Sequence, residues 1–85
     1  MIYRAEIKVL LKRSVLDPQG QAVEKALAIL SYDNVEHVRI GKYMELRLRA
    51  SDKTAAEAQV REMCERLLAN PVIEDFTFTV AEAEA

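Results

Sequence analysis

The chain has few of the residues on which catalytic, metal-binding or secreted domains of this size depend. Its 85 residues include one cysteine, one histidine, two glycines, two prolines and no tryptophan. The lone Cys64 excludes an internal disulfide and favours a reducing compartment, the cytoplasm. With His37 as the only histidine, ordinary zinc-ligand spacing is excluded as well, so no metal site is expected. No apolar run is long enough for a membrane span, and charged residues near the N-terminus leave no apolar signal core.

Charge excess of either sign is also missing. Twelve basic residues stand against 14 acidic ones, for a net charge of −2. A nucleic-acid-binding sheet needs a basic surface and projecting aromatic rings, and Tyr43 alone does not supply them. The composition is 51% hydrophobic and 31% charged, which is typical of a globular protein. We expect one domain over residues 1–80, followed by a frayed acidic tail over residues 81–85.

Three segments alternate apolar and polar residues with the period of a strand. They are residues 2–12, residues 35–50 and a last strand around residues 76–80. In residues 35–50 the apolar side chains hold the even positions, but Gly41-Lys42 interrupts the run. A two-residue loop there would put the two halves on opposite faces. The pattern therefore leaves two alternatives, a hairpin with a three-residue loop or one long strand that bends at Gly41.

Two helices separate these strands. Asp17-Pro18 is a helix-start signal, and apolar residues recur at helical spacing up to Leu30. The second helix begins after Ser51-Asp52 and ends at Asn70-Pro71, where asparagine tolerates a left-handed cap. Its predicted apolar stripe is Ala56, Val60, Met63, Cys64 and Leu67. The order β-α-β(β)-α-β predicts an α+β two-layer sandwich, with an antiparallel-type sheet and both helices on one face.

No combination of residues predicts catalysis. His37 is expected in solvent, and Cys64 lies on an apolar stripe where a thiol is buried and inert. The loop from Lys12 to Gly20 joins a strand to a helix, but it lacks the glycines of a phosphate cradle. Asp17 would also repel a phosphate from the helix start. We therefore expect a small module with no active site of its own.

Three runs of the chain resemble the PurS family, the small subunit of phosphoribosylformylglycinamidine synthase. The runs are Val9–Lys12 leading into Val15–Gly20, then Val38–Lys42, then Met63–Glu74. Their order and spacing fit over nearly the whole chain, although the family often has a glycine where this chain has Ser31-Tyr32-Asp33. The resemblance implies a non-catalytic subunit of an ATP-dependent ligase of de novo purine biosynthesis. The complex uses ATP, magnesium and glutamine, and this subunit is expected to bind no cofactor.

The resemblance also implies partners and contact residues. This subunit would bridge a PurL-type synthetase and a PurQ-type glutaminase, support ammonia transfer between them, and form a homodimer or homotetramer. The family's recurring positions give candidate subunit-contact or structural residues, which are Asp17, Pro18, Gly20, Gly41, Lys42, Asn70 and Pro71. Lys42 has no backbone role in the pattern, so it is the preferred contact residue.

Two further expectations come from the residues themselves. Ile2, Leu10 and Tyr43 interrupt the polar face of the sheet in a very small domain, which predicts at least a dimer. If residues 35–50 form one continuous strand, that dimer would be intertwined. The alternative function is an ACT-type ligand-sensing module, which has a similar element order. It requires a glycine-rich effector loop after the first strand, and the chain has no glycine before Gly20.

Overall fold

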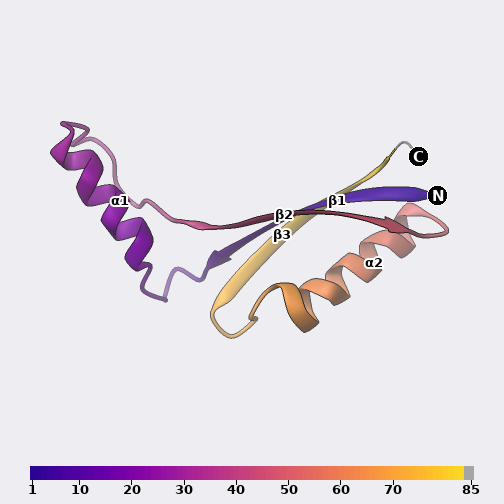
Figure 1. Ribbon diagram of the computed structural model, residues 1–85. Helices are drawn as coiled ribbons and strands as arrows, with labels where there is room; N and C mark the ends of the chain where they lie inside the picture. The colour runs from indigo at the N-terminus through magenta and orange to yellow at the C-terminus, as the bar shows by residue number, and fades with distance from the viewer. Residues whose placement is uncertain (84–85) are drawn as a thin grey trace.

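The computed structural model describes residues 1–83 and confirms the α+β class (Figure 1). The elements in order are β1 (Ile2–Leu11), α1 (Pro18–Ile29), β2 (Gly41–Arg49), α2 (Lys53–Met63), the short π-helical turn η1 (Cys64–Leu68) and β3 (Glu74–Glu82). β1 lies between β2 and β3 and is antiparallel to both. No helix in this part of the chain is long and apolar enough to cross a membrane.

The predicted alternation is confirmed in the sheet. On β1 the inner face is fully buried at Ala5 and Ile7, and Ile7 pairs with Met44 of β2 and Phe78 of β3. The even-numbered apolar residues of β2 pack together against this core, whereas Tyr43 and its odd-numbered neighbours lie on the opposite, exposed face. Burial of this one apolar face is the main contribution to stability in a domain of this size.

Residues 35–50 do not form a hairpin. β2 begins at Gly41, which is paired with Leu10, and residues 35–40 run into it without reversing direction (Figure 1). The second alternative, a chain that continues without reversal, is therefore confirmed, but only Gly41–Arg49 form a strand. Residues 35–40 lie past the end of β1, where no neighbouring strand of the described chain is present to complete a ladder.

α2 covers the inner face of the sheet, and its last turn differs from the predicted stripe. Asp52 caps the helix by accepting a hydrogen bond from the Ala55 amide at 2.7 Å. In η1 the Ala69 amide bonds to the Cys64 carbonyl, five residues back, at 3.0 Å. This π turn advances the buried stripe by one residue. Leu68 and Ala69 therefore contact the core, and Leu67, which was expected there, is 82% exposed.

The expectation that both helices cover one face is not met within a single chain. α1 begins at Pro18 with Asp17 as its cap, as predicted, but it lies beyond the end of the sheet (Figure 1). It makes no extensive contact with any other helix or strand of the described residues, and Leu30 at its end is 66% exposed. The radius of gyration is 16.5 Å, against about 12 Å for a compact chain of this length.

The C-terminal boundary also differs from the expected one. β3 continues through Glu82, and the Ala83 amide bonds to the Ile2 carbonyl at 2.8 Å. Ala81 and Glu82, expected in the frayed tail, are therefore strand residues, because β1 offers them a ladder as far as Tyr3. Glu84 and Ala85 lie outside the described residues.

Ile7→Ala tests whether the sheet face facing α2 is the core. We expect the free energy of unfolding to fall by about 2–5 kcal/mol, since the fully buried side chain leaves a cavity. Val72→Ala, at a side chain that is 78% exposed, is the matched control and is expected to change it by less than about 0.5 kcal/mol. Urea unfolding at one fixed chain concentration measures both. Equal effects of the two substitutions would contradict the assigned core.

Candidate functional site

The seven candidate residues all lie at or next to one end of the sheet. At this end β1 finishes, and β2 and β3 begin, because Leu10 is paired with Gly41 and Leu11 with Glu74. Asp17, Pro18 and Gly20 follow β1 directly at the start of α1, and Asn70 and Pro71 precede β3. The structure thus brings together positions that are up to 54 residues apart in the sequence.

Asp17 joins the start of α1 to the residue before β2. One carboxylate oxygen accepts a hydrogen bond from the Gly20 amide at 2.9 Å, and the other accepts one from the Ile40 amide at 2.9 Å. These two bonds hold the pKa of Asp17 below its ordinary value, because they stabilise the charged carboxylate. Gly20 is buried beneath this junction, and a Cβ atom on it would collide with the Val38 carbonyl oxygen.

Lys42, Glu74 and Asn70 form a second network. Lys42 Nζ lies 3.8 Å from Glu74 Oε2, and Glu74 Oε1 accepts a hydrogen bond from the Asn70 amide at 2.7 Å. The Glu74 side chain is only 13% exposed, whereas that of Lys42 is 63% exposed. The sequence interpretation did not single out Glu74. The one feature that could have indicated it was its place at the end of the third run that resembles the family.

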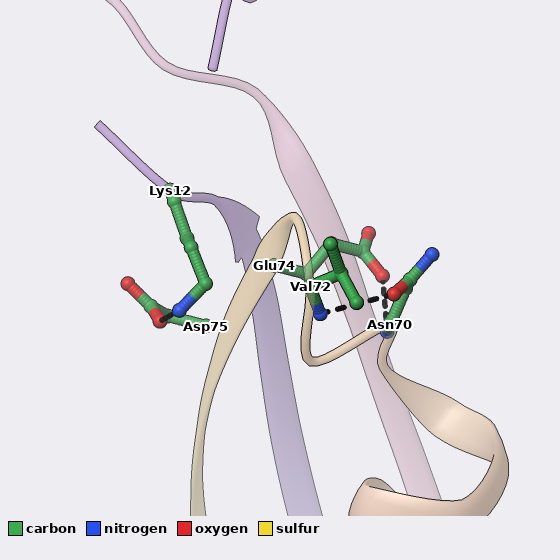
Figure 2. Close-up of polar contacts among 5 residues, drawn as sticks. All are labelled: Lys12, Asn70, Val72, Glu74 and Asp75. Carbon is green, nitrogen blue, oxygen red and sulfur yellow. Dashed lines mark hydrogen bonds and ion pairs between the residues drawn. The ribbon is translucent and has the colours of Figure 1, made fainter. Parts of the chain in front are cut away.

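Asn70 stops the helix by a different route from the predicted left-handed cap. The non-glycine residues with positive φ in the described chain are Ser31 and His37. Asn70 instead folds the next residues back on itself, since its side-chain oxygen accepts from the Val72 amide at 3.1 Å (Figure 2). Its carbonyl accepts from the amides of Ile73 and Glu74. Residues 70–74 are therefore a closed turn with exposed Pro71 and Val72 at its tip.

This turn is also tied to the end of β1. The Lys12 amide donates to the Ile73 carbonyl at 2.8 Å, and Lys12 Nζ pairs with Asp75 Oδ1 at 2.8 Å (Figure 2). The backbones of β1 and β2 also approach each other closely at Gly41, because a Cβ atom there would collide with the Val9 carbonyl oxygen. The sheet end is thus a rigid platform, and its exposed side chains include Lys42, Pro71, Val72 and Asp75.

Within residues 1–83, Cys64 and His37 are not partners in these hydrogen bonds and ion pairs. Cys64, the first residue of η1, is fully buried in the core, and this burial raises the pKa of its thiol. His37 is exposed and lines a concavity between the end of β1 and α1, together with Asp17 and Glu24. Across residues 1–83, no three His, Cys, Asp or Glu side chains are grouped as metal ligands.

The chain is similar throughout its length to known proteins of one family. The PurS family, described as phosphoribosylformylglycinamidine (FGAM) synthase, matches residues 4–82. The PurS subunit of this synthase from Bacillus subtilis is 52% identical over 84 residues, which cover 99% of each chain. The subunit from Methanocaldococcus jannaschii is 35% identical over 83 residues, covering 98% of this chain and 100% of the relative.

Solved structures agree in fold. A crystal form of B. subtilis PurS superposes with a TM-score of 0.82 at 54% identity, covering 94% of this chain and 99% of that one. Thermus thermophilus PurS superposes with a TM-score of 0.86 at 39% identity, covering 99% of this chain and 100% of that one. A chain of Thermotoga maritima PurLQS gives 0.87 at 31% identity, covering 95% and 99%.

Asp17→Asn tests the junction through its pH dependence. A carboxylate whose folded-state pKa is lowered stabilises the fold above its ordinary pKa of 3.8, and this stabilisation is lost as pH falls through the lowered value. The variant should therefore melt at a lower temperature than the parent at pH 7, and the difference should shrink from about pH 5 to about pH 2. Asp33→Asn, in an exposed turn, is the control. Melting curves of Asp17→Asn and the parent that stay parallel across this range would contradict the two hydrogen bonds.

Proposed function

The chain belongs to the PurS family of phosphoribosylformylglycinamidine synthase subunits, and from this premise we propose that it bridges a synthetase and a glutaminase. The observation that supports the bridging role best is the close match to a chain of T. maritima PurLQS. Catalysis resides in the other subunits, and we propose that ATP, magnesium and glutamine bind there and that this subunit binds no cofactor. We further propose that the complex works in the cytoplasm.

A bridging subunit has a clear physical task in glutamine-dependent ligation. Ammonia released at the glutaminase is protonated or lost if it reaches bulk water before the synthetase. A subunit that holds the two active sites in register supports the transfer without taking part in the chemistry. A rigid platform suits this task, since a preorganised surface loses little conformational entropy on binding. Three of its exposed side chains, Lys42, Pro71 and Val72, are the proposed contacts with the catalytic subunits.

The uncovered apolar side chains of α1 support a homodimer. Val23 is 38% exposed, Leu30 66% and the following Tyr32 56%. A groove between α2 and β2 has the complementary character, and its apolar lining is Leu46, Met63, Leu67 and Leu68. We propose that α1 of one copy lies in this groove of the other. Residues 35–40 would then run along the β2 edge of the second copy, which makes the dimer intertwined.

The bridging role is tested by supplying the amide nitrogen in two ways. In a mixture of the cognate synthetase and glutaminase, we expect glutamine-dependent synthesis to require this chain. Synthesis from free ammonium should depend on it far less, because ammonium bypasses the transfer between active sites. Full glutamine-dependent turnover without the chain would refute the bridge. Equal loss with both nitrogen sources would show that the chain supports the synthetase alone.

With the same three components, Lys42→Ala tests whether the platform is the contact surface. Its stability should fall by no more than about 1 kcal/mol, because Lys42 is itself exposed, the ion pair is long at 3.8 Å, and Glu74 keeps its hydrogen bond from the Asn70 amide. Assembly with the catalytic subunits should weaken, whereas Lys53→Ala, an exposed lysine at the start of α2, should leave assembly unchanged. Gel filtration of the three-component mixture measures the assembly of each variant, and urea unfolding measures its stability. Identical assembly of the two variants would remove Lys42 from the interface.

A further inference from the structure

The concavity between the end of β1, α1 and the segment that leads into β2 is large enough for a small molecule. Its volume is about 920 Å³, and small-molecule sites usually have about 300–1,000 Å³. It is distinct from the groove between α2 and β2, because none of the residues that line one of them lines the other. The proposed bridging contacts Lys42, Pro71 and Val72 do not line it either. The proposed function therefore gives this concavity no role.

Side chains of both charges line the concavity. Arg13 and Arg39 are basic and Asp17 and Glu24 are acidic, so the formal charges cancel with His37 taken as neutral. The two acids belong to α1 and its cap, whereas the arginines come from the loop after β1 and from the segment before β2. The carboxylates disfavour a phosphate or another plain anion. A mixed lining is complementary to a ligand that carries both charges.

The two arginines are available for a ligand. Within residues 1–83, neither Arg13 nor Arg39 forms an ion pair. Arg39 is half-buried, and its charge helps to lower the pKa of Asp17, although less than the two backbone hydrogen bonds to that carboxylate. Each guanidinium group can bind a carboxylate through two parallel hydrogen bonds.

Of the two acids, Glu24 is the better acceptor for a ligand. Both oxygens of Asp17 accept backbone hydrogen bonds. Within the described residues Glu24 uses Oε1 alone, which accepts from the Val38 amide at 3.2 Å. An ammonium group can therefore bind Glu24 through Oε2 without breaking the bond that holds Val38.

We propose that this concavity binds a free α-amino acid, with its carboxylate on Arg13 and Arg39 and its ammonium group on Glu24. Ser14, Gln21 and several apolar side chains complete the lining. A ligand side chain that ends in an amide can bond to Ser14 and Gln21, and its methylene groups can contact the apolar residues. L-Glutamine has this form and is the probe. The inference does not depend on the bridging role, because it involves no contact with a catalytic subunit.

The first test is calorimetric titration of the purified chain with three compounds, and it requires no variant. They are L-glutamine, N-acetyl-L-glutamine, which lacks the ammonium group, and the α-amide of L-glutamine, which lacks the carboxylate. We expect L-glutamine to bind with a Kd of about 1 mM or lower, and each blocked compound to bind about tenfold more weakly. Absence of L-glutamine binding would overturn the proposal. A blocked compound that binds as tightly as L-glutamine would indicate a site for a plain anion or cation and would also overturn it.

The second test assigns each end of the ligand to its residues. Glu24→Gln keeps an oxygen for the Val38 amide but removes the negative charge. It should weaken L-glutamine about tenfold and leave N-acetyl-L-glutamine unchanged, so that the two compounds bind alike. Arg13→Gln with Arg39→Gln should in the same way abolish the preference for L-glutamine over its α-amide. Variants that weaken all three compounds by the same factor would contradict these contacts.

Matched controls make the same changes in net charge outside the concavity. Glu57→Gln, and Arg49→Gln with Lys53→Gln, alter exposed positions on α2 and β2. Both controls should bind the three compounds as the parent does. Circular dichroism checks that every variant is folded. Equal loss of L-glutamine binding in the control and concavity variants would overturn the proposed site.

Discussion

The pairing of Leu10 with Gly41 determines the shape of the whole molecule. β1 ends and β2 begins at the same end of the sheet. Residues 12–40 must therefore leave the sheet and return to it at that end. Asp17 joins the start of α1 to the residue before β2, because it accepts hydrogen bonds from the amides of Gly20 and Ile40. α1 is consequently held past the end of the sheet (Figure 1), and within residues 1–83 the inner sheet face is covered by α2 and η1. The single chain leaves apolar residues of α1 and of the groove between α2 and β2 exposed, which supports our proposal that a second copy covers them.

At this end of the sheet the candidate residues have structural contacts with one another and with their neighbours. Lys42, Glu74 and Asn70 connect the starts of two strands, and Lys12 connects the end of the third to the same turn. These contacts make a stiff surface from polar side chains and backbone groups, and the thiol of Cys64 in η1 is buried in the core. A surface of this kind suits the bridging role proposed above.

Local patterns in the sequence were sufficient for the strands, the helix starts at Asp17 and Asp52, and the shared face of Met44 and Leu46. They were not sufficient for the end of α2, because adjacent leucines at 67 and 68 suit an α turn and a π turn equally well. The apolar stripe of α1 indicates a covered face but not which chain covers it. The ion pair of Lys42 with Glu74 joins residues on different strands, so no local spacing predicts it. The hairpin alternative failed because parity alone does not distinguish a reversal from a continuous strand.

The most direct measurement of this architecture is amide hydrogen exchange along the chain at several concentrations. α1 should exchange quickly in dilute solution, and its protection should rise with chain concentration as a second copy covers Val23 and Leu27. Protection of α2 around Val60, which is buried within its own chain, should change much less. Slow exchange of α1 that persists at concentrations where light scattering shows a monomer would contradict the central claim that another chain completes the fold.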